Sequence, residues 1–122
     1  MAIILKNLSN KWKSNRMSEI DDEILNELRD ITKNKESWKL NVDYVAGSLN
    51  ENYSIPVKAK SLWLLGEIGL ENPREIEKHV SDIAGYLEDD NPKLRERATN
   101  AIGRIGRADS HQLYGQIDEN EG

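Results

Sequence analysis

Residues 57–69 read VKAKSLWLLGEIG, and residues 94–106 read LRERATNAIGRIG. The two stretches share a hydrophobic first residue, basic residues at the second and fourth positions, and the ending Gly-x-Ile-Gly. They are related by a constant shift of 37 residues. Internal repeats with a period of about 20 to 50 residues are typical of stacked repeat architectures. The chain therefore contains two copies of one structural unit.

A shorter match precedes each copy. Residues 45–49 read VAGSL and residues 83–87 read IAGYL, a shift of 38 residues. The one-residue difference falls in the segment that joins the two matches, where an insertion is well tolerated because turns lie at the surface. Two matched helices with a variable turn between them predict a repeated helical hairpin.

The second stretch of each unit has the periodicity of a helix with one apolar stripe. Apolar or small residues recur at positions i, i+4, i+7, i+8 and i+11, which lie on one side of an α-helix. The small residue at i+4 would let the partner helix approach closely. The predicted core stripe consists of Val57, Ser61, Leu64, Leu65 and Ile68 in the first copy, and of Leu94, Ala98, Ala101, Ile102 and Ile105 in the second.

Two pairs of glycines punctuate these helices. Gly66 and Gly103 would each cost about 1 kcal/mol relative to Ala in an isolated helix. We therefore expect a neighbouring backbone to cross close to both of them. Gly69 and Gly106 stand where a left-handed C-terminal cap is expected.

Proline and asparagine mark the beginnings of the same helices. Pro56 and Pro92 occupy first-turn positions, where a missing N–H has no intrahelical partner to lose. Asn91 is the predicted N-cap of the second helix. The acidic run at residues 88–90 lacks the alternating ligands of a calcium loop. We expect it to stabilise the turn, with Arg95 and Lys58 as its partners.

The combined pattern resembles the HEAT repeat, in the short-period form also seen in phycobilisome-lyase-like proteins. It reads hydrophobic-basic-x-x-small-x-x-apolar-apolar-Gly-x-Ile-Gly and follows an Asp-rich turn at residues 88–92. The resemblance covers roughly residues 42–107. It implies an all-α fold, a right-handed α-solenoid of two to three helical hairpins. Tetratricopeptide repeats fit less well, because Trp63 lies three residues before Gly66 and not four.

The resemblance, together with the charge and periodicity of the two ends, divides the chain into five segments. A basic leader at 1–17 precedes a capping helix at 18–34. We expect the leader to be a frayed and disordered tail, and the alternative is contact with an anionic surface. Two HEAT-like repeats follow at 35–70 and 74–107, and a partial helix with an acidic tail at 109–122 ends the chain. The capping helix would cover the apolar side of the first repeat, because a repeat cannot bury its own face. Its stripe is Ile20, Ile24, Leu28 and Ile31.

Composition narrows the chemistry. The chain has no cysteine, which removes disulfides, thiolate metal sites and cysteine nucleophiles and favours a cytoplasmic location. Its two histidines, His79 and His111, have no metal-ligand spacing, and no Gly-rich loop opens a helix. We therefore expect no metal, no cofactor and no enzymatic activity. No apolar run is long enough for a membrane span.

Charge is unevenly distributed along the chain. Residues 1–16 hold four basic residues and no acidic one, so they contribute +4. The rest of the chain therefore carries −9, which gives the net charge of −5. An acidic body makes nucleic acid an unlikely partner, because phosphate binding needs clustered Lys and Arg. The alternative function nevertheless remains a nucleic-acid-associated module that uses the basic residues of 93–107.

The main hypothesis is a protein–protein interaction module. In HEAT proteins the second helices line the concave binding surface, so the resemblance assigns partner binding to their non-core faces. Trp63 has two readings, as an exposed interface residue or as a core residue packed against 35–49. The open ends of so short a stack also suggest pairing between copies of the chain. The predicted binding residues are Lys60, Trp63, Glu67, Arg97, Asn100 and Arg104.

Overall fold

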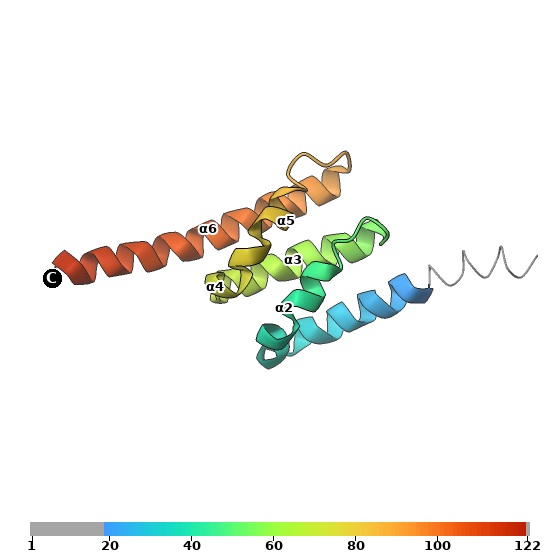
Figure 1. Cartoon of the computed structure of the whole chain (residues 1–122), viewed down its shortest axis with the longest axis horizontal. Coiled ribbons are helices and arrows are strands. Elements are labelled where there is room, and N and C mark those ends of the chain that lie inside the picture. Colours follow the sequence, from blue (N-terminus) through green and yellow to red (C-terminus); the bar gives the residue numbers. More distant parts are fainter. Residues whose placement is uncertain (1–18, 122) are drawn as a thin grey trace, which may run out of the picture.

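A computed structural model of the chain describes residues 19–121, and side chains for residues 19–108 (Figure 1). Throughout this range the chain is helical with connecting turns, and it forms no strand. The all-α prediction is therefore confirmed, whereas the leader expected at 1–17 lies outside the described residues. A helix at residues 19–33 is followed by η1 (Lys35–Ser37), α2 (Trp38–Gly47), α3 (Ile55–Glu71), α4 (Pro73–Ile76), η2 (Glu77–His79), α5 (Val80–Ala84) and α6 (Pro92–Glu121).

The elements form two consecutive helical pairs. In the first, α2 packs on α3; in the second, the broken segment α4–η2–α5 packs on α6. The three long helices, 19–33, α3 and α6, run in a row, and α2 and α5 cross this row (Figure 1). Among the elements from η1 to α6, the most extensive helix contact joins α3 to α6. This contact brings the second helices of the two repeats together.

The predicted stripes form the core. All five residues of the α3 stripe are fully buried, and so are Ala98 and Ala101 on α6. Leu94 and Ile105 are also buried, whereas Ile102 is only partly covered. The periodicity of the sequence thus identified the inward sides of both helices.

Hydrogen bonds join α2 to α3 and to helix 19–33. The hydroxyl of the fully buried Ser61 donates a hydrogen bond to the carbonyl of Val45 on α2, so the small residue does mark a close approach. The indole N–H of Trp38 donates to the carbonyl of Ile31 at 2.8 Å. This carbonyl, one of the last of helix 19–33, therefore accepts the indole N–H in addition to the backbone N–H of Asn34 at 3.1 Å.

Only one of the two expected backbone crossings is present. A Cβ atom added to Gly66 would lie 2.9 Å from the Cα of Ala101, so α6 crosses α3 at this glycine. Nothing among the described residues comes within 4 Å of a Cβ added to Gly103. The expectation for Gly103 is therefore wrong, because no helix among the described residues packs on that side of α6.

The predicted glycine caps are also wrong. No described glycine has a positive φ. The helix α3 continues past Gly69 to Glu71 and ends where Pro73 disfavours helical backbone at Asn72. No proline follows Gly106, and α6 continues to Glu121 without the break expected before residue 109. Gly69 instead makes room for a neighbour, since a Cβ there would overlap the Cγ1 of Ile105.

The turn before α6 has the predicted cap but different internal bonds. The Asn91 Oδ1 accepts the backbone N–H groups of Lys93 at 2.9 Å and of Leu94 at 3.3 Å, which confirms the N-cap. The Arg95 guanidinium donates to the carbonyls of Asp89 and Asp90, at 2.7 and 3.1 Å, and not to their carboxylates. The other expected partner of the acidic run, Lys58, lies over the Tyr86 ring, 6.0 Å from its centre.

The outer side of α6 differs from the corresponding side of α3. Ala59 and Leu62 are buried on α3, on the side of the helix that Gly66 shares. The repeat places Glu96 and Thr99 at the corresponding positions of α6, and both are exposed. The terminal helix therefore presents a polar surface where the internal helix presents an apolar one.

A polar contact between α2 and η2 joins the two helical pairs. His79 Nε2 lies 2.8 Å from Asp43 Oδ1, and the histidine side chain is only 14% exposed. The His79 side chain is therefore largely covered where the two pairs meet. The hydrogen bonds from His79 and Lys78 hold the pKa of the Asp43 carboxyl below its usual range.

The lowered pKa of Asp43 gives a pH-dependent contribution to stability. A carboxyl whose pKa is lower in the folded than in the unfolded state stabilises the fold above the unfolded pKa, and this contribution is lost as the pH falls through the folded pKa. We expect Asp43→Asn to lower the melting temperature slightly at pH 7, and the difference to close below about pH 4. Thermal unfolding followed by circular dichroism measures this. Glu88→Gln, at an exposed turn position, is the control. An equal loss at every pH would contradict the assignment.

Candidate interaction site

The six predicted binding residues lie on two neighbouring helices. Lys60, Trp63 and Glu67 follow one side of α3, and Arg97, Asn100 and Arg104 follow the facing side of α6. Because α3 and α6 pack along their lengths, the two rows run beside each other. The six residues have three different environments. Two of them pair with each other, one is exposed, and three line a pocket.

One end of this surface is already paired. The Arg104 Nε lies 3.3 Å from a Glu67 carboxylate oxygen, with both side chains about one quarter exposed at 25% and 27%. A partly exposed ion pair of this kind contributes up to about 1 kcal/mol. Glu67 and Arg104 therefore link the two helices, and their charges compensate each other. Asn100 is exposed and does not line the pocket.

The other end is a pocket of about 320 Å³. It brings together Lys60, Trp63 and Arg97 of the six predicted residues, and it adds residues from helix 19–33. We call it the cationic pocket. Its lining consists of Leu25, Arg29, Pro56, Ala59, Lys60, Trp63, Lys93 and Arg97.

Trp63 fits neither of its two readings fully. The side chain is partly buried and packs against the hydrophobic core, yet it also lines the cationic pocket with residues of helix 19–33 and α6. The Lys60 ammonium lies 4.4 Å from the centre of its ring. A cation at this distance is attracted to the ring face. Lys60 and Trp63 thus line the cationic pocket as a cation–π pair.

The charges of the cationic pocket are all of one sign. Four of its lining side chains are basic and none is acidic. None of the four, namely Arg29, Lys60, Lys93 and Arg97, forms an ion pair with another residue that the structure describes. Burial, together with the nearby charges of Arg29 and Arg97, lowers the pKa of the Lys60 ammonium. The cluster therefore repels itself when nothing is bound.

Sequence reasoning missed the contribution of helix 19–33. The sequence predicts that this helix covers the first repeat, but the segment has no visible repeat match, so nothing in the sequence brings Leu25 and Arg29 to the same site as Lys60. The sequence also predicts a single basic patch over 93–107. In the structure, Arg95 turns to the preceding loop and Arg104 to Glu67, while Lys93 and Arg97 reach the pocket.

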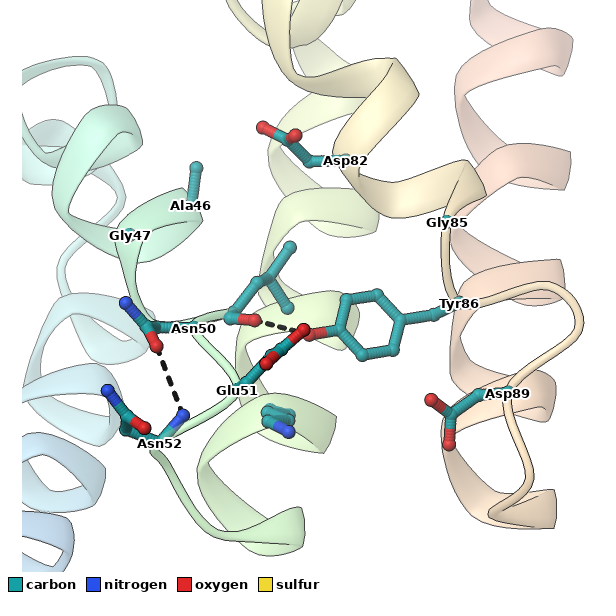
Figure 2. Close-up of a pocket in the computed structure, with 11 residues that line it drawn as sticks. Ala46, Gly47, Asn50, Glu51, Asn52, Asp82, Gly85, Tyr86 and Asp89 are labelled. Carbon is teal, nitrogen blue, oxygen red and sulfur yellow. Dashed lines mark hydrogen bonds between the residues drawn. The ribbon is translucent and has the colours of Figure 1, made fainter.

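A second pocket, of about 720 Å³, lies between the two turns that precede α3 and α6 (Figure 2). The Tyr86 ring lines it, and the Tyr86 hydroxyl donates a hydrogen bond to the carbonyl of Leu49. Burial and nearby acidic groups raise the pKa of this hydroxyl. Three acidic side chains, Glu51, Asp82 and Asp89, line the pocket together with Lys58. The bond between Tyr86 and Leu49 connects the two repeats.

The chain matches no protein-family model, and no curated protein or solved structure is significantly similar to it. No helix of the described part of the chain combines the length and apolar character that crossing a membrane requires. Within the same residues, no three His, Cys, Asp or Glu side chains gather in a way that could hold a metal ion.

Proposed function

We propose that this protein is a non-catalytic interaction module of the HEAT-repeat type, a right-handed α-solenoid that binds a protein partner on the surface formed by α3 and α6. The observation that carries the proposal is the cationic pocket, where Trp63 is half-buried among four basic groups that form no ion pair with any residue the structure describes. Tryptophan and arginine are the residue types that most often dominate binding energy at protein interfaces. The packing of α3 on α6 supports the solenoid arrangement.

The alternative is a nucleic-acid-associated module. Binding to a phosphate backbone relies on many Lys and Arg side chains that contact successive phosphates. The basic groups of 93–107 do not form such a row, because Arg95 and Arg104 are turned to other groups of the protein. This distribution favours a protein partner.

The proposal is tested by quantitative capture of the partner from the native cell extract. We expect Trp63→Ala to reduce recovery of the bound protein by about thirtyfold, the effect of losing a dominant interface residue. Leu40→Ala is the control, because Leu40 is 88% exposed on α2, outside the α3–α6 surface. Circular dichroism verifies that both variants are folded.

A second variant tests the α6 side of the surface. Arg104→Glu places two acidic groups opposite each other at Glu67 and should weaken capture of the same protein. Equal recovery with Trp63→Ala, Arg104→Glu and the unaltered chain would show that the partner binds elsewhere. Loss with Leu40→Ala alone would assign binding to the α2 side.

A further inference from the structure

We propose that the cationic pocket receives carboxylate side chains, and that the partner presents a short acidic segment to it. This inference rests on the proposed function, since it names the chemistry of the partner at that surface. Four basic side chains from three different helices converge there. Arg29 comes from helix 19–33, Lys60 from α3, and Lys93 and Arg97 from α6.

The convergence lacks a counter-charge within the described protein. The ion pairs of the described residues lie outside the pocket, for example Lys35 with Glu71 at 2.8 Å and Arg104 with Glu67 at 3.3 Å. The basic groups of the cationic pocket instead line one small site, and burial together with the charges of Arg29 and Arg97 lowers the pKa of the Lys60 ammonium. A carboxylate that enters the pocket relieves this repulsion and gains several charge-assisted hydrogen bonds.

The walls of the pocket favour a peptide over a bare anion. Leu25, Pro56, Ala59 and Trp63 supply apolar surface beside the cations. A segment in which an apolar side chain stands next to acidic ones matches both parts of this lining. The volume of about 320 Å³ lies at the lower end of ligand sites, so it accommodates only a few side chains.

The position of the four basic groups favours an acidic peptide over a nucleic acid as the ligand. The four groups lie across three helices at one end of the α3–α6 surface, and the next basic residue along it, Arg104, is paired with Glu67. An extended phosphate backbone would therefore lose its counter-charges beyond the pocket. A short acidic segment needs no more charge than the pocket provides.

The experiment uses the full chain and a synthetic peptide, Glu-Leu-Glu-Glu-Leu-Glu, with a fluorescent label, and measures binding by anisotropy. The companion probe replaces each Glu by Gln. We expect the acidic peptide to bind, the Gln peptide not to bind, and added salt to weaken the binding.

Matched double variants locate the site. Lys60→Gln with Arg97→Gln removes two charges from the pocket, whereas Lys39→Gln with Arg107→Gln removes two exposed charges outside it. We expect the first pair to weaken binding by about tenfold relative to the second. The first pair should also melt at the same or a higher temperature than the unaltered chain, because removing repulsion does not unfold the protein.

Three results would overturn the proposal. They are binding of the Gln peptide as strong as that of the acidic one, equal affinities for the two double variants, and tighter binding of a single-stranded oligonucleotide of the same net charge. If the acidic peptide does not bind while Trp63→Ala still abolishes capture of a partner, the interaction surface stands and only its acidic ligand is wrong.

Discussion

Replacing Gly66 with Ala should lower the free energy of unfolding by about 1–3 kcal/mol, the usual cost of overpacking a tight contact. The added methyl group would lie 2.9 Å from the Cα of Ala101, and a backbone atom cannot move without shifting α6. Gly69→Ala should act in the same direction through the buried side chain of Ile105. Urea denaturation measures both.

The second repeat supplies the matched controls for these changes. Gly103 and Gly106 have the same places in the repeat, but nothing among the described residues lies near their missing side chains. Gly103→Ala should therefore raise the free energy of unfolding by about 0.5–1 kcal/mol, the difference in helix propensity. Equal effects of Gly66→Ala and Gly103→Ala would contradict the close crossing of α3 and α6.

Leu28→Ala should have the largest effect on helix 19–33, about 2–5 kcal/mol for a fully buried leucine. Leu28 is completely inaccessible to solvent, and its neighbours Ile24, Leu25 and Ile31 are only partly buried. Its loss should release helix 19–33 from the rest of the protein before the two repeats unfold. Amide hydrogen exchange would show faster exchange in this helix than in α3.

Ile20→Ala is the control on the same helix, because Ile20 is 37% exposed. It should cost well under half as much as Leu28→Ala. Release of the helix would also remove Leu25 and Arg29 from the cationic pocket. Leu28→Ala should therefore weaken binding of an acidic ligand even though Leu28 does not line the site. Uniform loss of protection over all helices would contradict an independent release.

The sequence predicted the second helix of each repeat more accurately than it predicted the helix ends. The apolar stripe of α3 depends only on spacing within one helix, and it is buried as expected. Glycine has two uses in a helix, as a terminal cap and as a point of close contact. Gly69 serves the second use, and the packing of Ile105 that requires it is a tertiary contact that spacing does not reveal.

The candidate site was likewise predictable only where it depends on the sequence repeat and not on tertiary packing. Lys60 and Arg97 occupy equivalent repeat positions, so the repeat places them on adjacent helices. The approach of Arg29 depends on how helix 19–33 packs against α3, and no repeat match fixes that register. The contact between His79 and Asp43 joins first helices of different repeats and likewise has no signal in the sequence.

The polar residues on the outer side of α6 bear on how the protein could assemble into fibres. Copies that stack end to end through unlike surfaces form open filaments when their rotation does not close. A second molecule could pack on α6 in the same way that α6 packs on α3. It would then bury Glu96 and Thr99, which stand where α3 has Ala59 and Leu62. Burying an unpaired carboxylate is strongly unfavourable. These two side chains therefore act against filament growth from this end, and the pair of changes Glu96→Ala and Thr99→Leu would remove that obstacle.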